Sequence, residues 1–297
     1  MYQVRINIFI EVVLFGFLFF ILFPIKAHAD MGPKPSIVIQ LDNLDDKTCY
    51  GTLLSPTEHV AFYHKWDGDE NQIEDPFDNL EIWRKFVEYQ DADGYNFLQL
   101  GRKCSGETKY FSWNYMPPHK FKVLLYFEDT DTFYVSDIQD RYAFDSVYTV
   151  DINKLSEGST VAVKPSYDYI GEIRNLIIRV ILTVLIELFI AWLFVIRDKK
   201  AIAIITVTNV VTQLLLNILL NICTYKYGLG LMFVFNYIIL EIIIFIIEAI
   251  IYNKILRKKC ENRYSAVRVV IYALVANFVS YQVGLYLSVI LSTTKFF

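Results

Sequence analysis

Histidine is scarce in this chain, and its scarcity limits the chemistry that the chain can carry. Only four of the 297 residues are histidine, and none follows His119. Catalytic zinc sites usually include His ligands, so a zinc hydrolase in the apolar C-terminal part is disfavoured. The hydrolase motifs Gly-x-Ser-x-Gly and His-Glu-x-x-His are also absent, and His59, His64 and His119 lack the spacing of metal ligands.

Charged residues are also few, at 20% of the chain, whereas hydrophobic residues make up 55%. The hydrophobic residues are clustered toward both ends rather than dispersed. A uniform mixture would indicate one large soluble core, but clustering at the ends indicates membrane segments around a soluble domain. The composition therefore favours a membrane protein.

The first 29 residues have the composition of a secretory signal peptide. Arg5 supplies a positive charge, residues 12–22 are apolar, and residues 27–29 read Ala-His-Ala before Asp30. A small-x-small pattern at this place is typical of a cleavage site. We therefore predict a signal peptide over 1–29. The alternative is an uncleaved anchor, which leaves the downstream topology unchanged.

An acidic, soluble segment follows, and we predict an extracellular β-rich domain over 30–167. Residues 30–165 contain 24 Asp and Glu against 13 Lys and Arg, so nucleic acid is an improbable partner. Short runs rich in β-branched and aromatic residues predict strands at 36–41, 48–54, 95–100, 109–114, 121–127, 132–135, 146–151 and 160–163. The apolar face of 78–89 predicts one inserted helix. These elements predict a sandwich or a small barrel.

Four apolar runs near the C-terminus predict a four-helix transmembrane bundle over 168–297. They cover about 176–196, 201–225, 233–256 and 267–291, each close to or above the roughly 20 residues that span a bilayer. Two of the connections are basic, whereas the third connection and the tail contain only Lys226 and Lys295. The basic connections contain Arg197, Lys199, Lys200, Lys254, Arg257, Lys258, Lys259, Arg263 and Arg268. The positive-inside rule then predicts cytoplasmic basic loops, with the acidic domain and the C-terminus outside the cell.

Each apolar run carries one carboxyl or amide side chain at a matching depth, namely Glu187, Asn209, Glu248 and Asn277. These residues lie about 8–10 residues from the cytoplasmic ends of their runs, which is roughly 12–15 Å along a helix. Ionisable groups at that depth cost at least about 2.5–3.5 kcal/mol each and usually face the protein interior. We therefore predict an intramembrane polar site formed by these four residues.

Three interpretations of this polar site stay open. Protonated Glu187 and Glu248 form hydrogen bonds that hold the helices together, or they provide a proton or cation path, or they form a metal-dependent catalytic centre. A second polar layer lies nearer the outside, where Arg179 and Glu241 predict a structural charge pair. We predict no cofactor, and whether the site binds a metal is unknown.

Two further features of the predicted extracellular domain allow alternatives. Cys49 and Cys104 either form a disulfide or stay as two thiols, whereas Cys223 and Cys260 lie on opposite sides of the predicted membrane and cannot pair. Asp67, Asp69 and Asn71, with Asp78 further on, match part of a calcium-binding loop. Gln72 replaces the turn glycine of that loop, however, so we favour a solvated acidic loop that leads into the helix.

Several stretches of the chain resemble an uncharacterised group of bacterial multi-pass membrane proteins. They are residues 30–36, which read Asp-Met-Gly-Pro-Lys-Pro-Ser, 121–151 with Tyr-Ala-Phe-Asp-Ser at 142–146, and 241–249 and 276–284. Together they make up about a fifth of the chain. The resemblance implies a signal peptide, an external domain and a C-terminal membrane bundle, but no activity.

The sequence therefore predicts a non-enzymatic envelope protein that senses or binds a partner through its external domain. The lipid bilayer and another membrane or envelope protein are the predicted partners. The alternative is a small transporter or channel component that conducts protons or cations by means of Glu187 and Glu248. An intramembrane enzyme that uses the same carboxyl groups is the third hypothesis.

Overall fold

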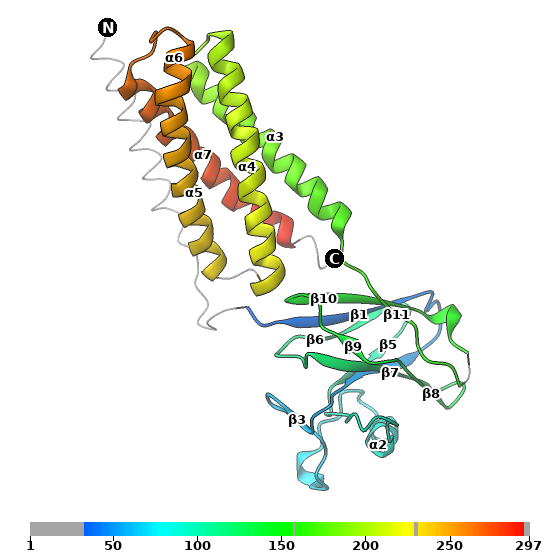
Figure 1. The fold of residues 1–297 in the computed structure, drawn as a ribbon. Helices are drawn as coiled ribbons and strands as arrows, with labels where there is room; N and C mark the ends of the chain where they lie inside the picture. The colour runs from blue at the N-terminus through cyan, green and yellow to red at the C-terminus, as the bar shows by residue number, and fades with distance from the viewer. Residues whose placement is uncertain (1–32, 157, 229–230, 294–297) are drawn as a thin grey trace. The chain divides into compact units, whose positions relative to one another are not determined.

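A computed structural model of the chain describes residues 33–156, 158–228 and 231–293. The predicted signal peptide at 1–29 lies outside the described residues. The described chain has a strand-rich part followed by four long apolar helices (Figure 1). Both of these coarse features of the predicted fold are confirmed.

The first sheet has four strands and combines segments from the two ends of the strand-rich part. In spatial order the strands are β11 (Val163–Pro165), β10 (Asp145–Asp151), β1 (Ser36–Asp42) and β6 (Tyr110–Trp113). β1 pairs in parallel with β10, from Ser36 opposite Asp145 to Asp42 opposite Asp151. The other two pairings are antiparallel. β10, the parallel partner of β1, comes near the end of the strand-rich part of the chain, so this sheet pairs the first strand with one of the last.

The second sheet has five strands. They are β5 (Gly101–Cys104), β2 (Cys49–Leu54), β7 (Lys120–Phe127) and β8 (Thr132–Val135) in spatial order, with β9 (Gln139–Asp140) also paired to β7. All of its pairings are antiparallel. A separate hairpin joins β3 (His59–Val60) to β4 (Tyr63–His64).

One hydrophobic core contains side chains from both sheets. Ile37, Ile39 and Leu41 of β1 are at most 1% exposed, which is the alternation expected of a strand with one buried face. β7 contributes every second residue from Phe121 to Phe127 to the same core. Because successive strand side chains point to opposite faces, the remaining residues of β7 face the other side of the sheet.

The other face of the second sheet is covered by helix α2 (Leu80–Glu88), seen below β5 and β7 in Figure 1. Trp83 and Phe86 of α2 pack in one cluster with Tyr50 of β2 and Tyr126 of β7. The helix begins where Asn79 accepts hydrogen bonds from two backbone N–H groups of the first turn. The predicted helix at 78–89 is thereby confirmed. Packing against both faces also explains why β2 is buried along its whole length.

The prediction of a strand at 95–100 is wrong. Tyr95 and Phe97 pack in the α2 cluster, Leu98 packs in the core shared by the two sheets, and Gln99 has a φ of 58°. A residue in this left-handed region cannot continue an extended ladder. Only Asn96 forms an isolated bridge, to Ser55. Residues 95–100 are therefore mostly buried residues of a loop, and their hydrophobic composition resembles that of a strand.

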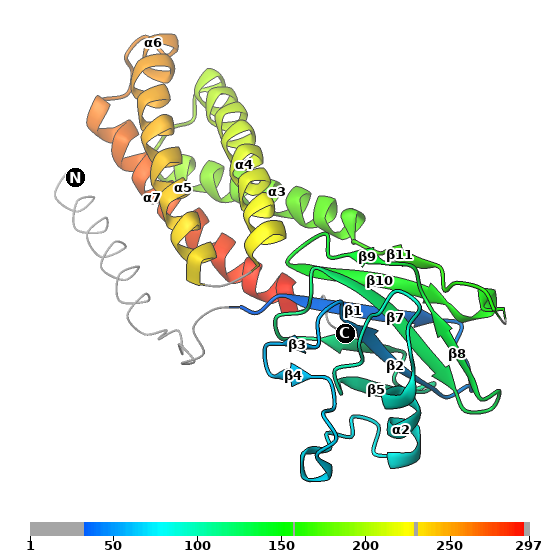
Figure 2. The ribbon, with the colours of Figure 1, turned by 60° about the horizontal axis from the view of Figure 1, so that its bottom comes forward.

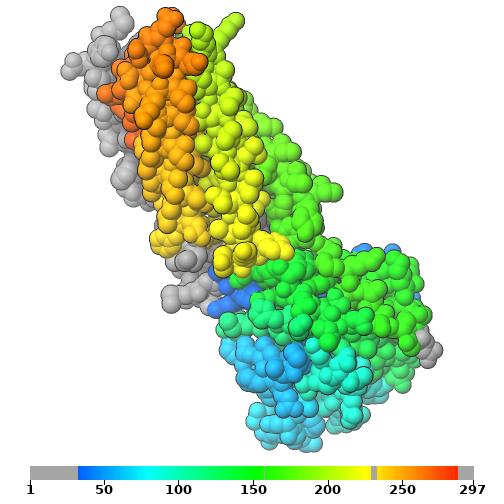
Figure 3. Space-filling view, in the orientation of Figure 1, coloured from blue at the N-terminus to red at the C-terminus, as the bar shows by residue number. Residues whose placement is uncertain are grey.

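The four apolar helices are long enough to cross a membrane by length and composition. They are α3 (Tyr169–Leu193), α4 (Lys199–Tyr227), α5 (Leu231–Ile251) with its continuation, and α7 (Ala266–Thr293). α5 continues through a π-helical turn, η3 (Tyr252–Leu256), into α6 (Arg257–Lys259), and the chain then turns back into α7 (Figure 2). α3 and α5 each pack against both α4 and α7, and α4 lies beside α5 in Figure 3.

Local signals set the ends of these helices. Asp168 accepts a hydrogen bond from the Gly171 N–H at 2.8 Å, so α3 begins seven residues before the predicted run at 176. Asp198 caps α4 in the same way. α3 ends where Val195 adopts a φ of 61°, and α4 ends at Gly228 with a φ of 73°.

Candidate functional site

The four residues of the predicted polar site lie on four different helices, and all face the interior. Glu187 of α3, Asn209 of α4 and Glu248 of α5 are 0% exposed, and Asn277 of α7 is 4% exposed. Their neighbours along the helices include many exposed Ile, Leu and Phe side chains. The polar residues are therefore on the inward face of each helix, as expected from the cost of placing them in lipid.

Glu248 has hydrogen bonds to both of its carboxyl oxygens. The Thr212 hydroxyl donates to Glu248 Oε1 at 2.6 Å, and the Asn277 amide donates to Glu248 Oε2 at 2.7 Å. These two bonds join α5 to α4 and to α7. The carboxyl group thus connects three helices at one point, and the structure places two of the predicted residues, Glu248 and Asn277, in direct contact.

Glu187 lies among different partners. The Tyr272 hydroxyl is 3.5 Å from Glu187 Oε2 and 3.4 Å from the Glu187 backbone oxygen, and the Asn209 amide adjoins the carboxyl group. Asn209 Nδ2 donates to the Tyr252 hydroxyl at 3.1 Å and to the Ile205 oxygen at 3.0 Å. The Thr212 hydroxyl, which donates to Glu248, also lies 3.2 Å from the Asn209 backbone oxygen. The four predicted residues therefore form two neighbouring groups rather than one ring.

Three acceptor oxygens in this cluster have no hydrogen-bond donor among the described residues. They are Glu187 Oε1, Asn209 Oδ1 and Asn277 Oδ1. The amide nitrogens of Asn209 and Asn277 are both occupied, so turning either amide over would break existing hydrogen bonds. A proton on Glu187 would supply one missing donor, and a small cation would be attracted to several of these oxygens at once.

Two members of the cluster, Thr212 and Tyr272, were not predicted from the sequence. Thr212 lies three residues after Asn209 and so shares its helix face, which is the one sequence signal that identifies it. Tyr272 is 0% exposed and carries a hydroxyl group into the interior of the helices. Buried Tyr hydroxyls usually have a hydrogen-bond partner, but the sequence does not show which Tyr residues are buried.

The predicted charge pair of Arg179 with Glu241 is not among the ion pairs of the residues that the structure describes. Arg179 Nε and Glu241 Oε2 are both buried without a hydrogen-bond partner there. Glu241 instead lies beside the Tyr237 hydroxyl, one turn earlier on α5. The structural role of this pair stays a prediction.

The acidic loop at 67–78 is organised by hydrogen bonds within the loop. Asp69 Oδ1 accepts from the Asn71 backbone N–H at 3.0 Å, and Asp69 Oδ2 accepts from Gln72 at 2.8 Å. These hydrogen bonds lower the pKa of Asp69, and the bond from the Asn71 backbone N–H has the largest effect. No group of three or more metal-ligating side chains is found in the described ranges. Asp69 thus begins the short helix η1 (Glu70–Gln72).

An exposed aromatic patch lies at the tip of the β3–β4 hairpin. The Phe62 ring is 66% exposed and stacks on the Tyr115 ring at 4.5 Å between centroids, and Met116 beside it is 52% exposed. The Lys34 ammonium lies 5.2 Å from the centre of the Tyr115 ring. We call Lys34, Phe62, Tyr115 and Met116 the hairpin patch. Exposed aromatic and Met side chains are enriched where proteins bind partners.

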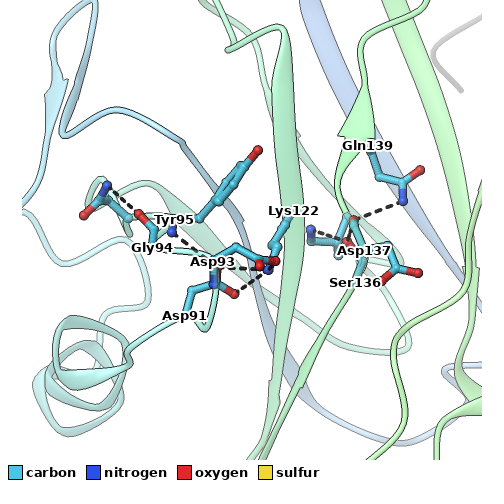
Figure 4. Close-up of polar contacts among 10 residues, drawn as sticks. Asp91, Asp93, Gly94, Tyr95, Lys122, Ser136, Asp137 and Gln139 are labelled. Carbon is cyan, nitrogen blue, oxygen red and sulfur yellow. Dashed lines mark hydrogen bonds and ion pairs between the residues drawn. The ribbon is translucent and has the colours of Figure 1, made fainter.

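A buried lysine holds the loop that follows α2 (Figure 4). Lys122 Nζ lies 2.8 Å from Asp91 Oδ1 and 2.5 Å from Asp93 Oδ2, and it also faces the Tyr95 ring at 5.4 Å. The Lys122 and Asp91 side chains are only 5% and 1% exposed. The Lys122 ammonium thereby attaches residues 91–95 to β7 through two ion pairs.

The fold and the site define a class of protein, namely a strand-rich domain followed by four apolar helices that suit a membrane. No protein-family model, no curated protein and no solved structure matches the chain. The resemblance to a bacterial multi-pass group therefore stays a prediction.

Proposed function

We propose that the chain is a multi-pass protein of the cell envelope whose strand-rich domain lies outside the cell and binds a protein partner. The four helices anchor this domain in the membrane, and their polar cluster holds them together. The lengths and apolar composition of α3, α4, α5 and α7 support the membrane anchor. The basic α3–α4 and α6–α7 connections support a cytoplasmic location for that end of the helices.

The hairpin patch is the observation that carries this proposal. Phe62 is held in an exposed position by stacking on Tyr115, whereas most other aromatic residues of the domain are buried. Ordering an exposed apolar ring before binding reduces the entropy that binding must remove, and aromatic anchors of this kind contribute much of the affinity at protein interfaces. The acidic charge of the domain supports a partner with a basic rim.

The test uses a photoreactive amino acid at position 62 in the full chain, with position 138 as a matched control. Ile138 is 44% exposed and apolar but lies outside the hairpin patch. We expect one reproducible adduct from position 62 and none from position 138. The partner identified from that adduct, once purified, is expected to bind the Phe62→Ser, Met116→Ser chain at least about tenfold more weakly than the wild type.

Equal cross-linking from positions 62 and 138, or unchanged binding by the double variant, would contradict a role of the patch in binding. An Ile138→Ser variant provides the control for surface polarity in the binding measurement. Because Phe62 and Met116 are exposed, their replacement is expected to change stability by less than about 0.5 kcal/mol. Loss of binding would then report the lost contact rather than unfolding.

A second candidate function is a proton or cation path, which the three unpaired acceptor oxygens around Glu187 and Glu248 favour. A proton shared between carboxyl and amide groups, or a small cation bound to their oxygens, would satisfy these atoms. The test is ion flux in proteoliposomes that contain the wild-type chain or a Glu187→Gln, Glu248→Gln variant. A conducting protein would lose its flux in this variant, whereas a protein with a purely structural cluster shows no flux in either form.

A further inference from the structure

A basic pocket lies between two connections at the end of the helices where α4 and α7 begin. One connection joins α3 to α4, and the other is the turn between α6 and α7. The pocket is lined by Val195, Arg197, Asp198, Lys199, Arg263, Tyr264 and Arg268. None of these residues belongs to the polar cluster or to the hairpin patch, so the pocket is a separate feature of the molecule.

Hydrogen bonds between the two connections build the pocket. The Asp198 backbone N–H donates to the Tyr264 hydroxyl at 3.3 Å, and Arg263 Nη1 lies 3.4 Å from Asp198 Oδ2. Within the α6–α7 connection, Arg257 Nε also donates to the Tyr264 backbone oxygen at 3.0 Å. Tyr264 is only 3% exposed, so its ring is fixed between the connections. Its hydroxyl accepts one bond and keeps its own proton for a further acceptor.

The pocket has a surplus of positive charge. It contains four cationic side chains and one carboxylate, which gives a net charge of +3. Hydrogen bonds from the Lys200 backbone, together with the nearby Arg263, lower the pKa of Asp198, so this carboxylate is ionised at neutral pH. Among the described residues, Arg263 alone of the four cations forms an ion pair, while Arg197 stacks over the Trp192 ring at 5.0 Å.

Two helix N-termini adjoin the same pocket. α4 begins at Lys199, and α7 begins at Ala266, two residues before Arg268. Helix N-termini carry partial positive charge and favour anions. Arg side chains add forked donors that match the oxygens of a phosphate group better than a single point charge does. Cationic side chains from two separate connections thus line one space.

We propose that this pocket binds a phosphate group, either the headgroup of an anionic phospholipid or a free phosphate. Under the proposed topology it lies on the cytoplasmic side, at the level where lipid headgroups meet the helices, and basic pockets between membrane helices bind such headgroups. The proposal goes beyond partner binding by the outer domain and does not depend on it. A bound lipid phosphate would join the α3–α4 connection to the start of α7.

The competing explanation is that these cations only orient the helices during insertion, as the positive-inside rule requires. Lys258 and Lys259 provide the means to separate the two explanations. They lie on α6 in the same basic connection and are exposed, but they do not line the pocket. Replacing them removes the same amount of charge from the same end of the molecule without changing the pocket.

The experiment titrates the purified full chain with three probes and follows its thermal midpoint. The probes are inorganic phosphate, short-chain phosphatidylglycerol and, as a neutral control, short-chain phosphatidylcholine. We expect an Arg263→Gln, Arg268→Gln variant to weaken binding about ten- to a hundredfold, because two charge-assisted contacts are lost. We expect a Lys258→Gln, Lys259→Gln variant to bind within about twofold of the wild type.

Asp198→Asn gives a test in the opposite direction. Asn caps a helix as well as Asp does, so α4 is kept, while the pocket loses its only carboxylate and is expected to bind several-fold more tightly. Binding of phosphatidylglycerol alone identifies a lipid site, and binding of inorganic phosphate identifies a site for a free anion. Absence of binding by both probes, or equal weakening in the two double variants, overturns the proposal.

Discussion

At the scale of single residues, Glu187 and Glu248 differ although they lie at matching depths. Glu248 has hydrogen bonds to both oxygens from Thr212 and Asn277, whereas Glu187 Oε1 has no donor among the described residues. A carboxyl group with two donors suits a structural role. A carboxyl group with a free oxygen beside other acceptors suits a proton or cation. The two residues therefore require separate substitutions as well as the double variant.

Glu248→Gln is expected to keep the unfolding free energy within about 0.6 kcal/mol of the wild type, as average contacts in membrane helices suggest. The Gln oxygen can accept from Asn277, and its amide can donate to Thr212, whose hydroxyl is already 3.0 Å from the Thr208 oxygen. Glu248→Leu leaves one buried amide hydrogen of Asn277 without an acceptor and is expected to cost about 1–3 kcal/mol. Thermal unfolding in detergent compares the two. Equal losses would contradict the hydrogen-bonding role.

Lys122 allows a prediction in the strand-rich domain. Lys122→Met leaves the Asp91 carboxylate buried without its partner and is expected to cost about 3–5 kcal/mol. Lys120→Met is the matched control, because Lys120 and Asp140 are 59% and 70% exposed and their ion pair contributes less than about 1 kcal/mol. Denaturant unfolding of both variants measures the difference. A loss in Lys122→Met no larger than in the control would show that the buried pair is not stabilising.

The same ion pair gives a pH dependence. Burial opposes the charge of Lys122, but the hydrogen bonds that its ammonium donates to Asp91 and Asp93 outweigh burial and raise its pKa. A raised lysine pKa stabilises the fold fully below the unfolded value of about 10.4, and this stabilisation is lost as the pH rises through the folded pKa. We therefore expect the wild type to lose more stability than Lys122→Met above about pH 10. Parallel unfolding curves for the two chains against pH would contradict this.

At the scale of elements, the pairing of β2 with β5 places Cys49 directly opposite Cys104. Opposed residues of antiparallel strands have Cα atoms about 4.5–5.5 Å apart, within the range that a disulfide needs. Both residues are thiols in this structure and both are 0% exposed. The contact with Cys104 and burial raise the pKa of Cys49, so the folded thiol is a poor nucleophile.

We expect the two cysteines to form a disulfide when the chain folds in the presence of a small disulfide such as oxidised glutathione. The two sulfurs lose two electrons and their protons, and the reagent is reduced to two thiols. Closing a loop of this length is expected to stabilise the domain by about 2–4 kcal/mol. Mass spectrometry after thiol alkylation detects the bond, and a Cys49→Ala, Cys104→Ala chain is the control. Alkylation of both thiols after such refolding would contradict the prediction.

At the scale of the whole molecule, the proposed topology predicts which residues are accessible from outside the cell. Glu107 lies in the strand-rich domain and Lys258 lies in the basic connection, and both are exposed. In chains whose own cysteines are replaced by Ala, a membrane-impermeant maleimide is expected to label Glu107→Cys in intact cells and Lys258→Cys only after lysis. The reverse result would invert the topology and move the phosphate pocket to the outside.

Much of the architecture follows from periodicity in the sequence. Runs of about 20 apolar residues predict the four long helices, and alternation in residues such as Ile37, Ile39 and Leu41 predicts strands. The inserted helix follows from its apolar face and its Asn79 cap. The strand predicted at 95–100 is wrong and shows the limit of this approach. A buried loop and a buried strand can contain the same hydrophobic residues, so composition does not distinguish them.

By itself, the sequence determined which residues must avoid lipid. Glu187, Asn209, Glu248 and Asn277 are costly to expose in an apolar helix, so their burial follows from their chemistry. Tertiary structure alone decided their partners, because hydrogen bonds depend on the rotation and height of neighbouring helices. It joined Thr212 to Glu248 and left Glu187 Oε1 unpaired. The parallel β1–β10 pairing and the basic pocket likewise depend on contacts between distant segments, which no local pattern encodes.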